Sequence, residues 1–496
     1  CYISQRSISM DIATNSAVWI SIALVFIVAV VTKVARGRVI SEPTCNRPPP
    51  PLVNFVSIIG LLYTLVTKGL QAMVSYQYSE LGSVFTVSLV GVKLTFLVGP
   101  EVSEHFYQGL DSEVTPNMRE FSVPMIGKGV AYGADATTRN EQGRFYSDAL
   151  KPSKLRSHVG PMLQEVENYF AKWGHEGTVD LGQELQQLLV LISARCLTGK
   201  EVREQTFDDF FGLFDEMLDN GMTLTSAPTL ANFRRDRAHT KLIEMCTEIV
   251  RSRKSSNQVE EDVLQNLIDS RYRDGRSTTE REVAGLIIAL LIAGKHTSSS
   301  TSTWTGACLI NSRRWLSAAI EEQKQIMRKY GDCIDYNVLL EMDVLHCCIK
   351  EVLRMHPPGL ASCRRVHKSF SVRSKEGIEY EIPRGHTIVS PILLNSNIPY
   401  IYEDPGTYDP GRFRAGREED KVGGRFSYTA FGCGRHACPG EAYAYMQIKV
   451  IWSHLLRNFE LTLQSPFPDT NWWKTVPEPK GKVTVSYKRR QLLSVY

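Results

Sequence analysis

The sequence predicts an α+β protein that is mostly helical, with small β-sheets near both ends of a large body and an apolar helix ahead of it. Through most of residues 140–356, apolar residues recur every three or four positions, the period of an amphipathic helix. Short alternating stretches at 83–100, 370–383 and 481–487 predict strands. With 496 residues, 43% of them hydrophobic, the chain can form a large core.

The start of the chain predicts a membrane anchor. Residues 1–10, which end at the first methionine, are set aside as an upstream artefact. Residues 11–35 contain a charge-free apolar run slightly shorter than the ~20 residues that span a bilayer, and a basic, proline-rich linker over 36–52 follows. A cleaved signal peptide is the alternative, but cations follow the run instead of a clear cleavage site, and they favour a cytosolic location for the rest. Residues 53–496 would form one domain.

Local signals predict the elements of this domain. Residues 83–100 turn around Gly91, which predicts a hairpin with more than the shortest turn. The turn at 273–280 carries capping residues and opens a long apolar helix over 282–310. Within that helix the apolar run gives way to LIAGKHTSSSTSTW at 291–304. Hydroxyl groups lower helix propensity, and the phosphate-loop pattern G-x-x-x-x-G-K-[ST] is not matched, so these hydroxyls require another explanation.

Charge and cysteine content argue against a nucleic-acid-binding protein and against a disulfide-stabilised one. The net charge is only +4, and no basic run with interleaved aromatics occurs, so nucleic acid is not expected as a partner. The eleven cysteines are odd in number and scattered, which indicates reduced thiols in a cytosolic environment more than a disulfide framework.

The most specific stretch is FGCGRHACPGEAYAYMQIK at 431–449. Proline suits the first helical position, so Pro439 places Cys438 beside a helix N-terminus, where thiolate is favoured over thiol. Glycines at 432, 434 and 440 would let the backbone approach something flat and large, and Arg435 could pair with an anion at its edge. A buried structural cysteine, half a zinc site with Cys433 and a hydrolase nucleophile are the alternatives. No second Cys/His pair or partner histidine supports the last two.

This stretch resembles the haem-thiolate signature F-x-x-G-R-x-x-C-x-G of the cytochromes P-450. Three further motifs follow the family's order: EVLR with Glu351 and Arg354, YDPGRF with Arg412, and AGKHTS with Thr297. On spacing alone, E-x-x-R is a helix salt bridge. The resemblance implies the cytochrome P-450 fold, haem b with Cys438 as the axial metal ligand, and a buried Glu351–Arg354–Arg412 cluster.

The resemblance also implies roles for other residues. Thr297, with His296 and Ser298, would relay protons during oxygen activation. Implied at the haem, besides Cys438, are Arg435, His436, Arg364, Tyr132, Phe431, Gly432 and Gly440. Implied at the substrate are Phe121, Ile126, Ala293, Leu360 and Ser362.

His296 stands where most members of the family carry an acid, and it resembles the sterol 14α-demethylase branch, as do NEQGRFYSDALKPSKLRSH and WSHLLRNFEL. In that branch the histidine is thought to pair with an acid from another helix, and Asp219 and Glu216 are the candidates. Three segments that would line the cavity depart from the plant members. Arg119 stands in place of a tyrosine, GLASCR at 359–364 in place of an apolar run, and the segment after Met222 lacks an apolar stretch.

These departures resemble a divergent grass subfamily whose best-known type oxidises β-amyrin by epoxidation and hydroxylation. Oxidation of a triterpenoid or modified sterol is therefore the main expectation, and obtusifoliol-type sterol 14α-demethylation is the alternative. A catalytically silent haem-containing sterol-binding protein, and a thiolate-haem isomerase or dehydratase that uses no O2, are the rivals from other classes.

The resemblance implies O2 as co-substrate and electrons from NADPH through NADPH–cytochrome P-450 reductase. The expected partners are this reductase, membrane lipid and an apolar small-molecule substrate, and the protein is expected to be a monomer. Its expected location is the endoplasmic reticulum membrane, with a single pass and the catalytic domain in the cytosol.

Overall fold

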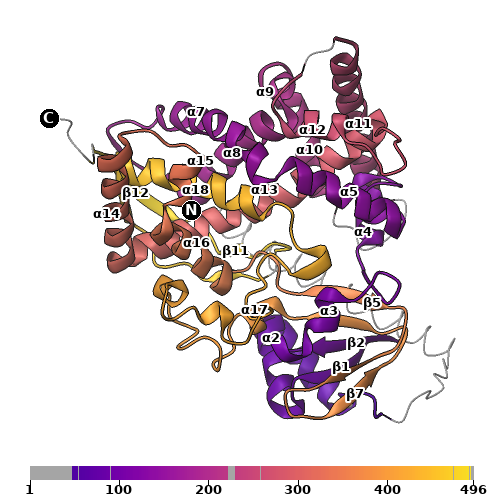
Figure 1. Cartoon of the computed structure of the whole chain (residues 1–496). Coiled ribbons are helices and arrows are strands. Elements are labelled where there is room, and N and C mark those ends of the chain that lie inside the picture. The colour runs from indigo at the N-terminus through magenta and orange to yellow at the C-terminus, as the bar shows by residue number, and fades with distance from the viewer. Residues whose placement is uncertain are drawn as a thin grey trace, which may run out of the picture. The chain divides into compact units, whose positions relative to one another are not determined.

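The computed structural model describes residues 47–53, 55–89, 91–221, 229–256, 259–472, 474–490 and 492. The predicted artefact, the anchor and residues 36–46 of the linker lie outside them, as does the start of the segment after Met222. The chain forms two compact units (Figure 1). Unit 1 comprises the residues up to Phe106 together with 112–115 and 363–390, and unit 2 comprises 107–111, 116–362 and the residues from 391 onward.

Unit 1 is built on a sheet with the strand order β1-β2-β8-β5-β3. The predicted hairpin is present, but Leu89 pairs with Val92, so its connection of two residues is shorter than expected. Gly91 has a φ of 75°, a left-handed conformation that suits a tight turn. The bounds are α2 (Phe55–Leu81), β1 (Val84–Leu89), β2 (Val92–Leu97), α3 (Glu104–Gln108), β3 (Val114–Pro116), β5 (Ser362–Val366), β6 (Phe370–Arg373), β7 (Glu379–Ile382) and β8 (Thr387–Ser390).

The arrangement of these strands agrees with the sequence pattern. Strands β1 and β2 are antiparallel, and the rings of Phe85 and Phe96 stack with centroids 5.1 Å apart. Strand β8 runs parallel to β2. The strands predicted at 370–383 are β6 and β7, which pair with each other as a separate antiparallel hairpin.

Unit 2 is mostly helical, as predicted. Its helices are α4 (Arg119–Ile126), α5 (Ala136–Ala149), α6 (Pro152–Leu155), α7 (Val159–Phe170), α8 (Leu181–Ser193), α9 (Lys200–Gln205), α10 (Phe207–Asp219), α11 (Leu230–Ser256), α12 (Val263–Asp269), α13 (Glu280–Asn311), α14 (Arg313–Tyr330), α15 (Tyr336–Leu340), α16 (Asp343–Met355), α17 (Ile392–Asn395) and α18 (Glu441–Asn458). Its strands are β4 (Glu176–Asp180), β9 (Phe459–Leu463) and β12 (Thr484–Arg489), which form one sheet, and the pair β10 (Thr470–Asn471) and β11 (Glu478–Pro479).

Helix α13 is the central element of unit 2 and packs against α8, α11, α16 and α18 (Figure 1). It begins as predicted, because Thr279 and Glu282 form a capping box at its N-terminus. The apolar stretch 283–288 is buried. Among the described residues this helix alone is long and apolar enough to cross a membrane, but 56% of its apolar window is buried inside the protein. That burial, and its place among other helices, identify α13 as a core helix.

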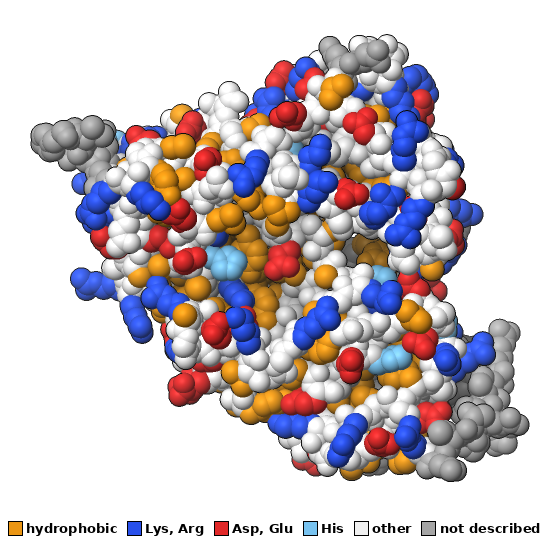
Figure 2. Space-filling view, in the orientation of Figure 1, with side chains coloured by type: hydrophobic (Ala, Val, Ile, Leu, Met, Phe, Trp, Pro, Cys, Tyr) orange, Lys and Arg blue, Asp and Glu red, His pale blue; other side chains and the backbone are white. Residues whose placement is uncertain are grey.

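The surface carries mixed charge. Figure 2 shows Lys and Arg side chains interspersed with Asp and Glu over the visible face, in agreement with the net charge of +4.

Candidate active site

A tightly folded loop carries Cys438. Gly432 and Gly434 have φ angles of 70° and 68°, a region that side chains rarely adopt. The N–H of Cys438 donates to the carbonyl of Phe431 over 2.8 Å and closes the loop. Helix α18 begins at Glu441 with Gly440 as its N-cap, so Pro439 lies just outside the helix and not at its first position as predicted. Cys438 nevertheless lies beside the helix N-terminus.

The sulfur of Cys438 has a mixed environment. Burial by the surrounding protein raises the pKa of the thiol above its usual value, and the N–H of Gly440, directed at the sulfur, lowers it. Desolvation of the sulfur outweighs this N–H, although Cys438 is exposed by its surface area, and the thiolate preference predicted from the helix N-terminus stays a prediction. A metal ion would reverse this balance, because a coordinating thiol loses its proton.

Segment 107–111 lies against the loop. A Cβ atom at Gly434 would lie 2.2 Å from the carbonyl oxygen of Tyr107, so only glycine allows this approach. The Nε–H of Arg435 donates to the carbonyl of Gln108 over 3.0 Å. The His436 Nε2 lies 3.0 Å from Asp111 Oδ1. Each residue of the turn 434–436 therefore has its own partner in this segment.

One part of α13 is open although most of the helix is buried. Ala293 and His296 are exposed and Thr297 is partly buried, whereas the stretches 283–288 and 300–309 are buried. The hydroxyl of Thr297 donates to the carbonyl of Ala293 over 2.7 Å. Thr301, Thr303 and Thr305 make the same bond to the carbonyl four residues earlier. Such back-bonding supplies the partners that these hydroxyls need inside a helix.

Another side of α13 faces α18 and contains small polar residues. Ser298 accepts a hydrogen bond from the Gln447 side chain over 2.5 Å. The Trp452 indole N–H lies 3.1 Å from the Ser302 hydroxyl. At Gly306 a Cβ atom would lie 2.4 Å from the Trp452 ring. Much of the hydroxyl-rich stretch therefore serves helix packing.

Ser298, the neighbour of Thr297 in the sequence, contacts α18. It is only 6% exposed and bonded to α18. Its bond to Gln447 gives Ser298 a part in helix packing, and its predicted catalytic role stays a prediction.

His296 is influenced by two acidic residues that were not predicted from the sequence. Its pKa is lowered by burial and by Lys295, while the carboxylates of Glu478 and Asp215 act to raise it. Asp215 forms an ion pair with Lys295. The candidates Asp219 and Glu216 are not among the largest contributions to this shift, and their pairing with His296 stays a prediction. Glu478, far away in the sequence, could not have been inferred from helix spacing.

The three residues predicted to form a buried cluster do so. Glu351 accepts from Arg354 Nε over 2.7 Å and from Arg412 Nε over 2.9 Å, and all three side chains are at most 1% exposed. The sequence missed Glu419, which accepts from Arg412 over 2.5 Å. Glu419 also pairs with Arg417, so it links the buried cluster to a further guanidinium group.

The remaining predicted residues lie on several elements. Tyr132 is in the single turn η2 (Ala131–Gly133), and Arg364 lies in unit 1, with its guanidinium 4.9 Å from the centre of the Phe106 ring. Ile126 on α4 is 7% exposed, and Phe121 on the same helix packs against the core. Leu360 and Ser362 are half-buried before and at the start of β5.

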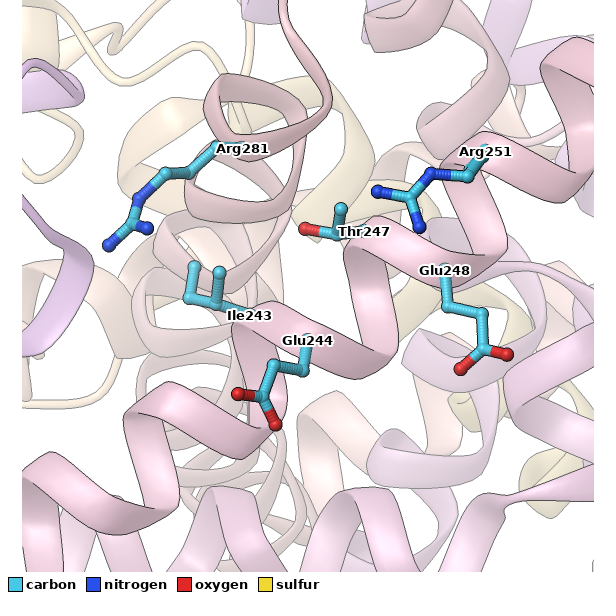
Figure 3. Close-up of a pocket in the computed structure, with 6 residues that line it drawn as sticks. All are labelled: Ile243, Glu244, Thr247, Glu248, Arg251 and Arg281. Carbon is cyan, nitrogen blue, oxygen red and sulfur yellow. The ribbon is translucent and has the colours of Figure 1, made fainter.

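A surface pocket of about 550 Å³ lies elsewhere in unit 2, between α11 and the start of α13 (Figure 3). Ile243 and Thr247 line it with four charged side chains: Glu244, Glu248, Arg251 and Arg281. None of the predicted site residues lines it, and its polar lining does not suit an apolar substrate.

The loop and α13 fit a flat group held by a single protein ligand. Cys438 is exposed at the loop surface, as are Ala293 and His296 on an otherwise buried helix. Within the described residues, no three His, Cys, Asp or Glu side chains cluster as metal ligands, which argues against the zinc alternative. A haem needs only the one thiolate.

Comparisons with known proteins identify the family. The cytochrome P450 family model matches residues 48–485. An obtusifoliol 14-alpha demethylase of Triticum aestivum is 50% identical over 90% of this chain and 99% of that protein. A sterol 14-demethylase of Arabidopsis thaliana is 50% identical over 93% and 96%. Among solved structures, retinoic acid-bound cyanobacterial CYP120A1 matches with a TM-score of 0.77 at 20% identity, over 90% of this chain and 100% of that one, which confirms the fold. The chain therefore belongs to the cytochrome P450 family and, within it, to the sterol 14α-demethylase family of haem-thiolate monooxygenases.

Proposed function

We propose that the protein removes the 14α-methyl group of an obtusifoliol-type sterol. The observation that carries this proposal is the 50% identity to a wheat obtusifoliol 14-alpha demethylase over 90% of the chain. It favours the alternative of the sequence analysis over β-amyrin oxidation. Like the family, the protein uses haem, O2 and electrons that NADPH supplies through a reductase.

Cys438 is the proposed axial ligand of the haem iron. When bound, the haem supplies the activation of O2 that oxidises a substrate carbon. The loop around Cys438 holds the sulfur in place through the bond from its N–H to Phe431, and the glycines at 432, 434 and 440 keep side chains away. Arg435, His436 and Tyr132 of unit 2 are the proposed partners of the haem carboxylates. The bond to Gln108 uses the Nε–H of Arg435 and leaves its terminal N–H groups for this role.

Thr297 and His296 are the proposed proton-relay residues. The Thr297 hydroxyl has two lone pairs and one proton; it donates a hydrogen bond to the carbonyl of Ala293, so its lone pairs are left to accept a hydrogen bond from a proton donor in the site. The lowered pKa of His296 favours the neutral imidazole, which can accept a proton at one nitrogen and donate from the other.

The proposed substrate wall consists of Ala293 together with Phe121, Ile126, Leu360 and Ser362. β-Amyrin remains a second candidate substrate because Arg119 stands in place of a tyrosine of the plant pattern. This is one of the departures that resemble the β-amyrin-oxidising subfamily. Arg119 Nη1 donates to the carbonyl of Gly133 over 3.3 Å, which ties the start of α4 to η2. A sterol and a pentacyclic triterpene are both rigid apolar polycycles, and apolar pockets discriminate poorly between such shapes.

We further propose NADPH–cytochrome P-450 reductase as the redox partner and the endoplasmic reticulum membrane as the location. The apolar run within residues 11–35 supports the membrane location, and the cations after it support a cytosolic position for the catalytic domain.

The test is a spectral binding titration of the full-length protein with obtusifoliol and, separately, β-amyrin, followed by product analysis with reductase and NADPH. We expect a strong spectral shift with obtusifoliol and a C14-demethylated product. Oxygenated β-amyrin with no product from obtusifoliol would instead establish the second candidate. No product from either, despite normal haem content, would favour a silent sterol-binding protein.

A further inference from the structure

Asp111 gathers three partners from two distant parts of unit 2. Its Oδ1 lies 3.0 Å from His436 Nε2 and 3.2 Å from Arg139 Nη2. Its Oδ2 accepts from the Asn140 side chain over 2.8 Å. His436 belongs to the Cys438 loop, whereas Arg139 and Asn140 are on α5, so this carboxylate joins the loop to a helix about 300 residues earlier in the chain.

The cluster is well shielded from solvent. The side chains of Asp111, Arg139 and His436 are only 13–14% exposed. The three partners hold the pKa of the Asp111 carboxyl below its usual value against the effect of burial. Charge-assisted hydrogen bonds in such surroundings are stronger than those between neutral groups.

The Arg139 guanidinium has N–H groups that make no hydrogen bond. Its Nε and Nη2 are buried atoms without a hydrogen-bond partner, although Nη2 lies within ion-pair distance of Asp111. An unsatisfied buried guanidinium N–H is costly, and a carboxylate is the group that its planar fork fits best. Haem carries two such carboxylates at its edge, and Arg139 is held by the same aspartate as His436.

We propose that Asp111 is a positioning residue that holds His436 and Arg139 together as one pair of hydrogen-bonding side chains for a haem carboxylate, and thereby secures the Cys438 loop around the haem. This inference rests on the proposed ligation of haem by Cys438. It assigns a task to Asp111 and Arg139 that the sequence motifs do not indicate. The Cys438 loop is then secured twice, by backbone contacts at Gly434 and Arg435 and by the contact of the His436 ring with Asp111.

The experiment compares haem loss from the purified full-length holoprotein and its Asp111→Asn variant, measured as transfer of haem to excess apomyoglobin. We expect haem loss to be about tenfold faster in Asp111→Asn, because bonds to a charged group are replaced by bonds to an amide. The haem reduction potential should also shift to a more positive value, because a negative charge near the haem is removed. An Asp111 that is remote from the haem would leave the potential unchanged, whatever its effect on folding.

Asp135→Asn is the matched control, because Asp135 caps α5 by accepting from the N–H of Thr138 and does not contact the loop. It should lose haem at the wild-type rate. Equal rates in the two variants, or a rate in Asp111→Asn within twofold of wild type, would overturn the proposal. If Asp111→Asn does not fold, Asn140→Ala removes one of the bonds to Asp111 and should speed haem loss about threefold; an unchanged rate there would also overturn it.

These measurements need no substrate. Normal haem retention in Asp111→Asn would therefore leave the sterol proposal standing. Conversely, absence of C14 demethylation in a protein that retains haem would leave the role of Asp111 standing.

Discussion

Small hydroxyl-bearing residues on two sides of α13 have different roles. On one side they pack against α18, and on the other the proposed role is proton relay. Toward α18, Ser298 and Ser302 bond to Gln447 and Trp452, and Gly306 lets the indole ring approach. On the open stretch, Ala293 and His296 are exposed and Thr297 is bonded only to its own helix. A hydroxyl in the packed face has its bonds fixed by folding, whereas one in the open stretch can exchange a proton. Position on the helix therefore decides the role of each hydroxyl.

Cys438→Ala tests whether the protein binds the haem at which the open stretch is proposed to function. This substitution should have the largest effect. Without the thiolate there is no axial ligand, so we expect complete loss of the thiolate-type Soret band of the reduced carbon monoxide complex and of all turnover. Absorbance spectra and haem content measure this. Cys433→Ala is the matched control in the same loop and should keep both; a full thiolate-type band in Cys438→Ala would contradict the assignment.

Thr297→Ala tests the open stretch itself. We expect product formed per NADPH consumed to fall about a hundredfold, the usual scale for loss of a group that positions a proton, with little change in thermal stability. Ser298→Ala is the neighbouring control: it leaves the buried Gln447 amide without its acceptor, so it should cost about 1–3 kcal/mol of stability and preserve the coupling of NADPH to product. If both variants lose coupling equally, the two sides do not differ in function.

The sequence predicted one of these roles and not the other, for a physical reason. Thr297 was recognised because a family motif names it, and Thr279 because a capping box is local. Gln447 lies 149 residues from Ser298, and no local spacing encodes such a pairing. The same holds for Glu478 near His296. Motifs therefore select the candidate residues of the site, whereas tertiary packing determines their charged neighbours.

The Glu351 cluster shows the same division. The motifs supplied Glu351, Arg354 and Arg412, which the structure brings together. They did not supply Glu419, because a carboxylate only 7 residues from Arg412 in a loop carries no periodic signal. The N–H groups at the start of α18 could be expected beside Cys438 from the sequence, whereas the protein atoms that desolvate its sulfur could not.

Gly306→Ala tests the packed face by stability alone. Its Cβ would lie 2.4 Å from the Trp452 ring and 2.6 Å from Leu181, so overpacking should cost about 1–3 kcal/mol. Gly294→Ala on the same helix meets nothing within 4 Å and should be neutral or stabilising by up to about 1 kcal/mol. Denaturant unfolding measures both. Equal losses in the two variants would show that glycine is needed for helix geometry and not for contact with α18.

Glu478→Gln tests the electrostatics of the open stretch and should have the smallest effect. The Glu478 carboxylate acts to raise the pKa of His296 and Lys474 acts to lower it. Removing the carboxylate should therefore lower that pKa further, so protonated His296 disappears at a lower pH. Since His296 and Glu478 are partly solvated, any limb of the pH–rate profile that reports His296 should move down by less than about one unit. Lys474→Gln should move the same limb up. Shifts of the same sign in both variants would mean that the limb reports another group, and the proton relay would then lie away from this face of α13.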